Sequence, residues 1–281
     1  MSTRVQPDFD SITVGPVTAR LLQAGPNQAS EAVVFIHGNP GSAADFAGLV
    51  ELVGEHRRAI AFDLADFGQT VAAPDFGHTV DEYGEYVDEM LRTLGISRVH
   101  LVLHDFGGPI GLNWASKHLG KNASITLINT GLLLDYKWHR TARAWQTPGV
   151  GELLQAITTR TMFRRVTGNA EPRGLPREFL DEMYDNFDRR TRAAVLDLYR
   201  DAKKIRNDHA KLVPLFHAAD IPSMVIWGAG DPYLGAEMAE RQKEGFPSIE
   251  VHVLPESGHW PYIDDPPAVE RLVLDFLARQ S

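Results

Sequence analysis

One aspartate lies where the local sequence favours exposure of a reactive side chain. Residues 101–111 read LVLHDFGGPIG, an apolar strand that runs into a glycine-rich turn and then a helix, with Asp105 at the turn. Beside glycines, at the carboxyl end of a central parallel strand, such a side chain stands clear of the backbone. The following helix N-terminus stabilises negative charge nearby. We therefore expect the Asp105 carboxylate to attack an electrophilic carbon and form an alkyl-enzyme ester.

Two further candidate residues follow predicted strands in the same way. Asp231 lies in WGAGDPYL and His259 in PESGHWPY, and the segment His37-Gly38-Asn39-Pro40 precedes both. Taken one at a time, Asp231 can be a turn residue, His259 a structural histidine and Asp105 a helix cap. Their joint occurrence at strand ends, in the order nucleophile, acid, histidine, favours a catalytic site instead.

The composition restricts the protein class and its partners. The 281 residues include 28 Lys and Arg against 37 Asp and Glu, a net charge of −9, without a basic stripe, so neither nucleic acid nor a membrane surface is expected as a partner. The chain has no cysteine, which excludes disulfides and cysteine-based metal sites. The first residues, MSTRVQPDFDS, lack the pattern of a signal peptide, and no apolar stretch reaches the length of a membrane helix. We expect a cytoplasmic protein.

The elements that must position these residues follow an α/β pattern. Short apolar runs alternate with segments of helical period, which predicts a mostly parallel sheet, and residues 14–22 are expected to add an antiparallel hairpin arm. The sequence between two of the strands is helical and rich in Arg and aromatic residues, as in an inserted cap. We assign residues 1–130 and 217–281 to the core and residues 131–216 to a helical cap. The strands are predicted at 32–36, 58–62, 99–103, 125–128, 223–227 and 251–254.

With these motifs in this order, the chain resembles the α/β-hydrolase superfamily, and within it the branch with an aspartate nucleophile, which includes epoxide hydrolases and haloalkane dehalogenases. The resemblance covers nearly the whole chain. It implies that Asp105 is the nucleophile, His259 the base that activates water and Asp231 the carboxylate that orients His259. It also implies an oxyanion hole formed by the backbone amides of Asn39 and Phe106. Water is then the second substrate, and neither a metal nor an organic cofactor is expected.

The leaving group decides between two activities within this branch. Opening an epoxide produces an alkoxide, so the enzyme needs an acidic O–H group close to that oxygen. Tyr199 in LDLYRDA resembles the second cap tyrosine of epoxide hydrolases, with a tyrosine on an amphipathic helix as the ordinary alternative. The first cap tyrosine has no clear match, and Tyr136 or His139 in LLLDYKWHR is expected to substitute for it, with ordinary packing as the alternative for either residue. The favoured function is conversion of small apolar epoxides to vicinal diols.

A haloalkane dehalogenase is the alternative activity. Such enzymes use N–H donors for the departing halide and typically have tryptophan after the nucleophile, where this chain has Phe106. Asn39 in HGNP nevertheless resembles the halide-binding asparagine of many dehalogenases, and Leu103 stands where epoxide hydrolases commonly have a small residue. A non-enzymatic ligand receptor that uses the same pocket is a third hypothesis. The acidic composition is compatible with a monomer or a homodimer.

Overall fold

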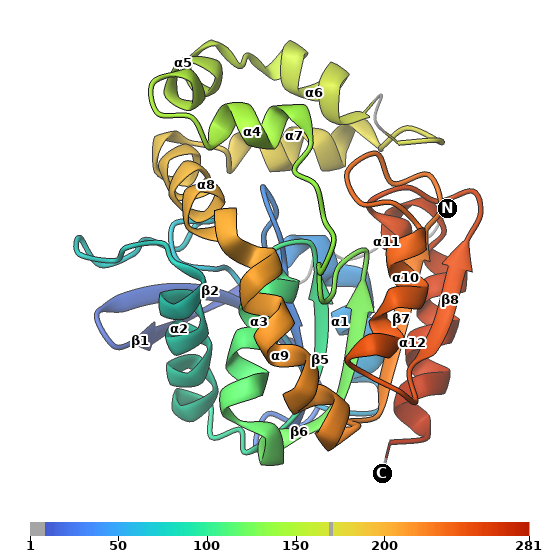
Figure 1. Ribbon diagram of the computed structural model, residues 1–281. Helices are drawn as coiled ribbons and strands as arrows, with labels where there is room; N and C mark the ends of the chain where they lie inside the picture. The colour runs from blue at the N-terminus through green and yellow to red at the C-terminus, as the bar shows by residue number, and fades with distance from the viewer. Residues whose placement is uncertain (1–8, 169–170, 281) are drawn as a thin grey trace.

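The strands of the protein form one twisted sheet. The computed structural model describes residues 9–168 and 171–280, and in this part of the chain eight strands pair in the order β1-β2-β4-β3-β5-β6-β7-β8 (Figure 1). The strands from β3 to β8 are mutually parallel, whereas β2 pairs antiparallel with both β1 and β4. The strands are β1 Phe9–Val14, β2 Val17–Ala24, β3 Glu31–Ile36, β4 Ala59–Phe62, β5 Arg98–His104, β6 Asn122–Ile128, β7 Ser223–Gly228 and β8 Glu250–Leu254.

Helices cover both faces of this sheet, which is why its central strands are apolar at nearly every position. In β3 and β5 every residue after the first is buried. Helices α2, α3 and α9 lie together on one face, and α1 and α12 contact each other on the other (Figure 1). Among the described residues, no helix is both long and apolar enough to cross a membrane. The core helices are α1 Ala47–Gly54, α2 Val80–Thr93, α3 Gly107–Lys117, α9 Ile205–Ala219, α10 Glu237–Arg241, α11 Pro261–Asp264 and α12 Pro266–Ala278.

The ends of two elements differ from the prediction. The antiparallel hairpin expected at 14–22 is present but longer, because its two strands cover residues 9–14 and 17–24. The chain reverses at Gly15, between β1 and β2. Gly15 has a φ of 55°, a left-handed conformation that glycine adopts without strain. β6 also begins three residues before the predicted strand, since its polar first residues still pair with β5. The apolar runs located the strands but did not mark these ends.

A helical cap lies over the carboxyl ends of the parallel strands (Figure 1). It is inserted between β6 and β7, as expected from the helical sequence there. Helix α9 was also expected to belong mostly to the cap, but it packs beside α3 on the core (Figure 1). The helical layer of the core therefore begins before residue 217. The cap helices are α4 Arg140–Trp145, α5 Val150–Ile157, α6 Arg160–Gly168, α7 Arg177–Asp185 and α8 Arg189–Asp201.

Candidate active site

The turn after β5 gives Asp105 a backbone conformation that few side chains adopt. Its φ of 48° lies in the left-handed region, which costs about 1–3 kcal/mol for a residue with a Cβ. Two glycines allow the close packing that holds this turn. A Cβ on Gly107 would lie 2.1 Å from the carbonyl oxygen of Ile36, and one on Gly38 would lie 2.3 Å from the Cβ of Asp105. The carboxylate consequently emerges between the loop after β3 and the start of α3.

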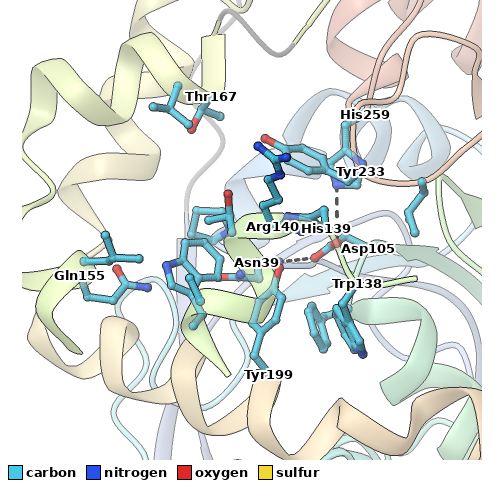
Figure 2. Close-up of a pocket in the computed structure, with 18 of the residues that line it drawn as sticks. Asn39, Asp105, Trp138, His139, Arg140, Gln155, Thr167, Tyr199, Tyr233 and His259 are labelled. Carbon is cyan, nitrogen blue, oxygen red and sulfur yellow. Dashed lines mark hydrogen bonds and ion pairs between the residues drawn. The ribbon is translucent and has the colours of Figure 1, made fainter. Parts of the chain in front are cut away.

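The two carboxylate oxygens of Asp105 have different neighbours. Oδ1 accepts a hydrogen bond from the backbone N–H of Asn39 at 2.7 Å, and Oδ2 lies 3.6 Å from Nε2 of His259 (Figure 2). Burial would raise the pKa of Asp105, but His259 and the Asn39 amide outweigh it, so this pKa lies below its ordinary value. The ionised group that a nucleophile requires is therefore favoured. Because Oδ1 is held by a backbone donor, Oδ2 is the oxygen available for attack.

His259 is aligned by Asp231, whose side chain is fully buried. Nδ1 of His259 donates to Oδ2 of Asp231 at 2.8 Å. The backbone N–H groups of Tyr233 and Leu234 donate to Oδ1 of Asp231 at 2.7 and 3.0 Å. Burial disfavours a charged His259, but the carboxylates of Asp231 and Asp105 outweigh it and raise its pKa to about 10. An ester on Asp105 removes one of these charges, which lowers the pKa of His259 and lets it act as a base.

Sequence analysis did not single out Asn129, which follows β6. Its Nδ2 donates to Oδ2 of Asp231 at 2.6 Å, and its Oδ1 accepts from the N–H of Gly228 at 3.0 Å. Asn129 thus gives the Asp231 carboxylate a further donor and ties the loop after β6 to the end of β7. The one available signal was its position directly after a predicted strand, a feature that it shares with Asp105.

We expect Asn129→Ala to slow hydrolysis of the predicted ester about 10-fold, because a hydrogen bond to a charged group contributes roughly 1.5–3 kcal/mol. The rate is measured as the disappearance of the alkyl-enzyme mass in rapid-quench samples. Asn122→Ala is the matched control, since Asn122 lies at the other end of β6, where its side chain donates to the backbone carbonyls of Ala115 and His118. Equal rates for the two variants would show that Asn129 does not support Asp231.

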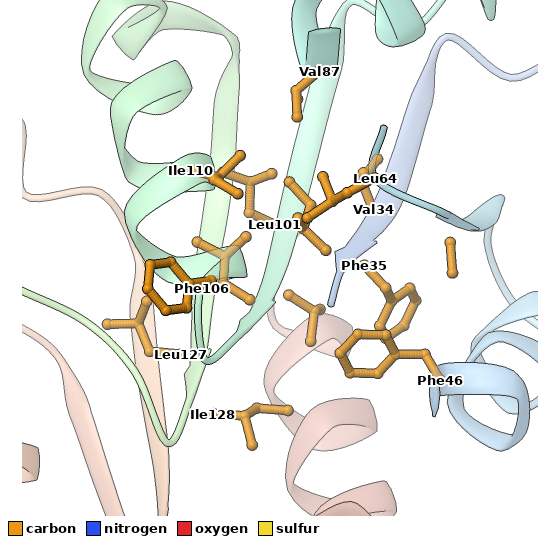
Figure 3. Packing of buried hydrophobic residues seen from close by; sticks show 14 of the residues in the cluster. Val34, Phe35, Phe46, Leu64, Val87, Leu101, Phe106, Ile110, Leu127 and Ile128 are labelled. Atoms are coloured by element: carbon orange, nitrogen blue, oxygen red, sulfur yellow. The ribbon is translucent and has the colours of Figure 1, made fainter. Parts of the chain in front are cut away.

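Phe106, predicted as the second oxyanion donor, is the N-cap residue of α3. Backbone N–H groups at this end of a helix have no partner inside it. Within the described residues, the Asn39 amide is hydrogen-bonded to the Asp105 carboxylate, but no such bond joins the Phe106 amide to it. The Phe106 ring lies beside Leu127 in the apolar core (Figure 3), with its centroid 4.8 Å from that of Tyr199. The role of the Phe106 amide stays a prediction.

A cavity of about 470 Å³ lies between the candidate catalytic residues and the cap. Asn39, Asp105 and His259 are among the core residues that line it. Most of the cap residues that line it are aromatic or aliphatic, but the cap also contributes polar side chains, which include Arg140, Gln155 and Thr167. Figure 2 shows Tyr199 rising from α8 with its hydroxyl next to Asn39 and Asp105. Cavities of this size and character hold small organic molecules.

Two tyrosines predicted as leaving-group residues meet in this cavity. The rings of Tyr136 and Tyr199 both pack against Trp138, with centroids 4.9 and 5.5 Å away. The side-chain amide of Asn39 faces the Tyr199 hydroxyl. Burial, and then the Asp105 carboxylate, raise the pKa of Tyr199 and of Tyr136. Both phenols therefore keep their protons and can donate them to a substrate oxygen.

His139, the other candidate at the cap entrance, is the N-cap residue of α4. Its Nδ1 accepts a hydrogen bond from the backbone N–H of Ala142 at 3.3 Å, and its ring packs on Tyr233. Burial lowers the pKa of His139, so the ring is neutral. His139, Tyr136 and Tyr199 all line the cavity, and the two tyrosines share the ring of Trp138 as a neighbour.

The two histidines that flank the catalytic loops are held by the backbone. Nε2 of His37 accepts from the N–H of Leu64 at 2.9 Å, and Nε2 of His104 lies 2.9 Å from the carbonyl oxygen of His259. Burial lowers the pKa of both, that of His104 to about 3. These residues position loops. In the part of the chain that the structure describes, no group of three or more His, Cys, Asp or Glu is placed to hold a metal ion.

Comparison with protein families agrees with this arrangement. A family model described as alpha/beta hydrolase fold matches residues 31–266. The chain belongs to the α/β-hydrolase fold family. Its mostly parallel sheet is the fold predicted from the sequence, and that prediction is confirmed.

Individual relatives of this α/β-hydrolase carry out different reactions. A 2-hydroxy-6-oxononadienedioate/2-hydroxy-6-oxononatrienedioate hydrolase of Pseudomonas sp is 23% identical over 287 residues, 96% of each chain. A haloalkane dehalogenase of Agrobacterium fabrum is 38% identical over 86 residues, which are 31% of this chain and 28% of the dehalogenase. The solved structure of haloalkane dehalogenase DatA from Agrobacterium tumefaciens C58 has a TM-score of 0.84 at 21% identity and covers 98% of this chain and 97% of its own. These similarities establish a hydrolase fold without selecting a substrate.

Proposed function

We propose that this α/β-hydrolase opens small apolar epoxides to vicinal diols through an alkyl-enzyme ester on Asp105. The observation that carries the proposal is the pair of buried phenols, Tyr136 and Tyr199, in the apolar cavity of the nucleophile. An epoxide requires a nucleophile at carbon and an acid at oxygen. This cavity supplies the first from the core and the second from the cap.

In the first step Oδ2 of Asp105 attacks an epoxide carbon and the carbon–oxygen bond of the ring breaks. The electron pair of that bond goes to the ring oxygen, which takes the proton of Tyr199 while Tyr136 donates a hydrogen bond. The product is a hydroxyalkyl ester of Asp105 and a Tyr199 phenolate. Because the ester is neutral, His259 no longer faces a charged nucleophile and releases its proton to solvent more readily.

In the second step His259 takes a proton from water, and the hydroxide adds to Cγ of Asp105. The Asn39 amide, 2.7 Å from Oδ1, holds the oxygen on which negative charge develops. The ester bond then breaks, and the departing alkoxide takes the proton from His259 to give the diol. The remaining proton on the Asp105 carboxyl passes through solvent to the Tyr199 phenolate. His259 regains a proton from solvent once Asp105 is charged again, which restores the enzyme.

Haloalkane dehalogenation is the second candidate function, supported by the dehalogenases among the relatives and by the Asn39 amide in the cavity. The same ester would form, with a halide ion as the leaving group. Phe106 has no side-chain N–H for a halide, and Figure 2 shows the indole nitrogen of Trp138 turned away from Asp105. The phenols therefore favour the epoxide reaction.

Tyr199→Phe is expected to slow epoxide opening about 100-fold, because a positioned acid contributes about 10²- to 10⁴-fold and Tyr136 remains as a donor. Ester formation is followed by quenched-flow intact mass with a panel of apolar epoxides and haloalkanes. A double variant that also carries Tyr136→Phe should lose a further factor of about 10 or more.

Tyr184→Phe is the matched control, because the Tyr184 hydroxyl donates to the carbonyl oxygen of Thr158 in the cap and does not line the cavity. Its rate should match that of the unchanged enzyme. Ester formation from haloalkanes that survives Tyr199→Phe but is lost in Asn39→Ala would replace the epoxide proposal with dehalogenation.

A further inference from the structure

A buried carboxyl group of the cap reaches the loop that carries the catalytic base. Glu171 lies between α6 and α7 and is only 5% exposed. Its Oε2 accepts a hydrogen bond from the backbone N–H of His259 at 2.8 Å. The proposed mechanism gives Glu171 no part in either step, although this cap residue accepts a hydrogen bond from the backbone of His259, the proposed base.

The core makes room for this contact by using glycine at two positions. A Cβ on Gly258 would lie 1.8 Å from Oε2 of Glu171. A Cβ on Gly230, next to the catalytic Asp231, would lie 2.4 Å from Cγ of Pro172. The segment with Glu171 and Pro172 is therefore in van der Waals contact with both loops that carry the acid–base pair.

Two successive backbone amides of the histidine loop are each held by a carboxyl group. The N–H of Gly258 donates to Oδ2 of Asp264, a core residue on α11, at 2.6 Å. The next N–H, that of His259, donates to Glu171 of the cap. The loop is thus fixed from the core at one residue and from the cap at the following one.

We propose that Glu171 is a positioning residue for His259, through which the seated cap fixes the ring that activates water. This inference rests on the proposed ester mechanism. Since Nδ1 of His259 is already bonded to Asp231, the remaining freedom of the ring is that of its backbone, which Glu171 restrains. The cap thereby supports ester hydrolysis as well as substrate binding.

A shared proton accounts for the unusual pairing of two carboxyl groups here. Glu171 and Asp264 lie within hydrogen-bond reach, and Oε1 of Glu171 and Oδ1 of Asp264 are both buried without a donor in the described part of the chain. One proton between them satisfies both oxygens. Burial and the neighbouring carboxylates raise the pKa of Glu171 to about 8, although His259 opposes this, so Glu171 is the protonated member.

Ionisation of Glu171 would set it against other negative charges. The His259 amide favours the charged form of Glu171, but above pH 8 that charge also faces Asp264 and Asp231. Repulsion between these carboxylates should displace Glu171, and hydrolysis should slow. The titratable groups that interact with Glu171 are His259 after β8, Asp231 and Tyr233 after β7, and Asp264 and Tyr262 on α11. The guanidinium of Arg173, on the same segment as Glu171, pairs with Glu256 and also faces Asp264 and Asp265.

The test compares Glu171→Ala with Glu171→Gln in single-turnover reactions with an epoxide, resolving ester formation from ester hydrolysis by intact mass. Glu171→Ala should slow hydrolysis about 10- to 100-fold and change ester formation less than about 3-fold, because displacement of a catalytic group by about 1 Å costs rates of this order. Glu171→Gln keeps an acceptor for the His259 amide and can donate to Asp264. The rate of ester hydrolysis in Glu171→Gln should lie within about 3-fold of the rate in the unchanged enzyme. This rate should not decline above pH 8, because glutamine does not ionise.

Glu178→Ala, at an exposed position on α7, is the matched control and should leave both rates unchanged. Equal slowing of both steps by Glu171→Ala, or no slowing, would overturn the positioning role. Hydrogen exchange of the His259 backbone amide gives a readout that needs no turnover. Exchange at least about 10-fold faster in Glu171→Ala than in Glu171→Gln supports the proposal, and equal exchange contradicts it. If the unchanged enzyme forms no ester at all, the proposed function fails, and the exchange result still decides the role of Glu171.

Discussion

Asp105→Asn should lower turnover roughly 10⁴- to 10⁶-fold, because no other group in the cavity can form the ester and loss of a nucleophile costs rates of this order. Asn has nearly the shape of Asp and adopts the left-handed conformation found at this position, a φ of 48°, more readily than most residues. The variant should therefore keep the fold while losing the reaction. Turnover is measured with a panel of epoxides, and the melting temperature verifies the fold.

Asp75→Asn, at an exposed position, is the control for the same chemical change and should retain full activity. Turnover of Asp105→Asn within about 10-fold of the unchanged enzyme would exclude Asp105 as the nucleophile. If the unchanged protein binds apolar ligands but turns none over, the ligand-receptor hypothesis gains support.

His259→Gln should trap the ester that Asp105 forms. The base is needed to deprotonate water in the second step, and its loss should slow hydrolysis about 10²- to 10⁴-fold. Removing the cation also removes an interaction that lowers the pKa of Asp105, but the hydrogen bond from the Asn39 amide, which lowers this pKa as well, remains and favours the ionised carboxylate. Ester formation should therefore continue while hydrolysis stops.

Intact-mass spectrometry reads the trapped species directly. An added mass equal to a whole epoxide supports the epoxide reaction, whereas an added alkyl group without its halogen supports dehalogenation. The adduct should be absent when Asp105→Asn is combined with His259→Gln, and His217→Gln, at an exposed position on α9, should accumulate none. Full hydrolysis in His259→Gln would assign the base to another residue.

The sequence by itself determined the candidate catalytic framework, because its signals are local. A strand that ends in a glycine-flanked turn identifies Asp105, and Asp231 and His259 follow later strands in the same way. Parallel strands bring their carboxyl ends to one edge of the sheet, so residues at those ends meet whatever the intervening sequence. The pattern of alternating strands and helices likewise predicted the fold and the inserted helices.

Only the tertiary structure decided which residues support that framework. The Asn129 amide meets Asp231 across 102 positions of sequence, and Glu171 meets His259 across 88. Neither contact leaves a local pattern, because each depends on how two separately folded segments pack. The surroundings of the candidate leaving-group residues were set in the same way, because the His139 ring caps α4 and the Tyr136 ring packs against Trp138. Periodicity and turn chemistry report what each segment does alone, whereas the environment of a buried polar group is set by the distant segment that packs against it.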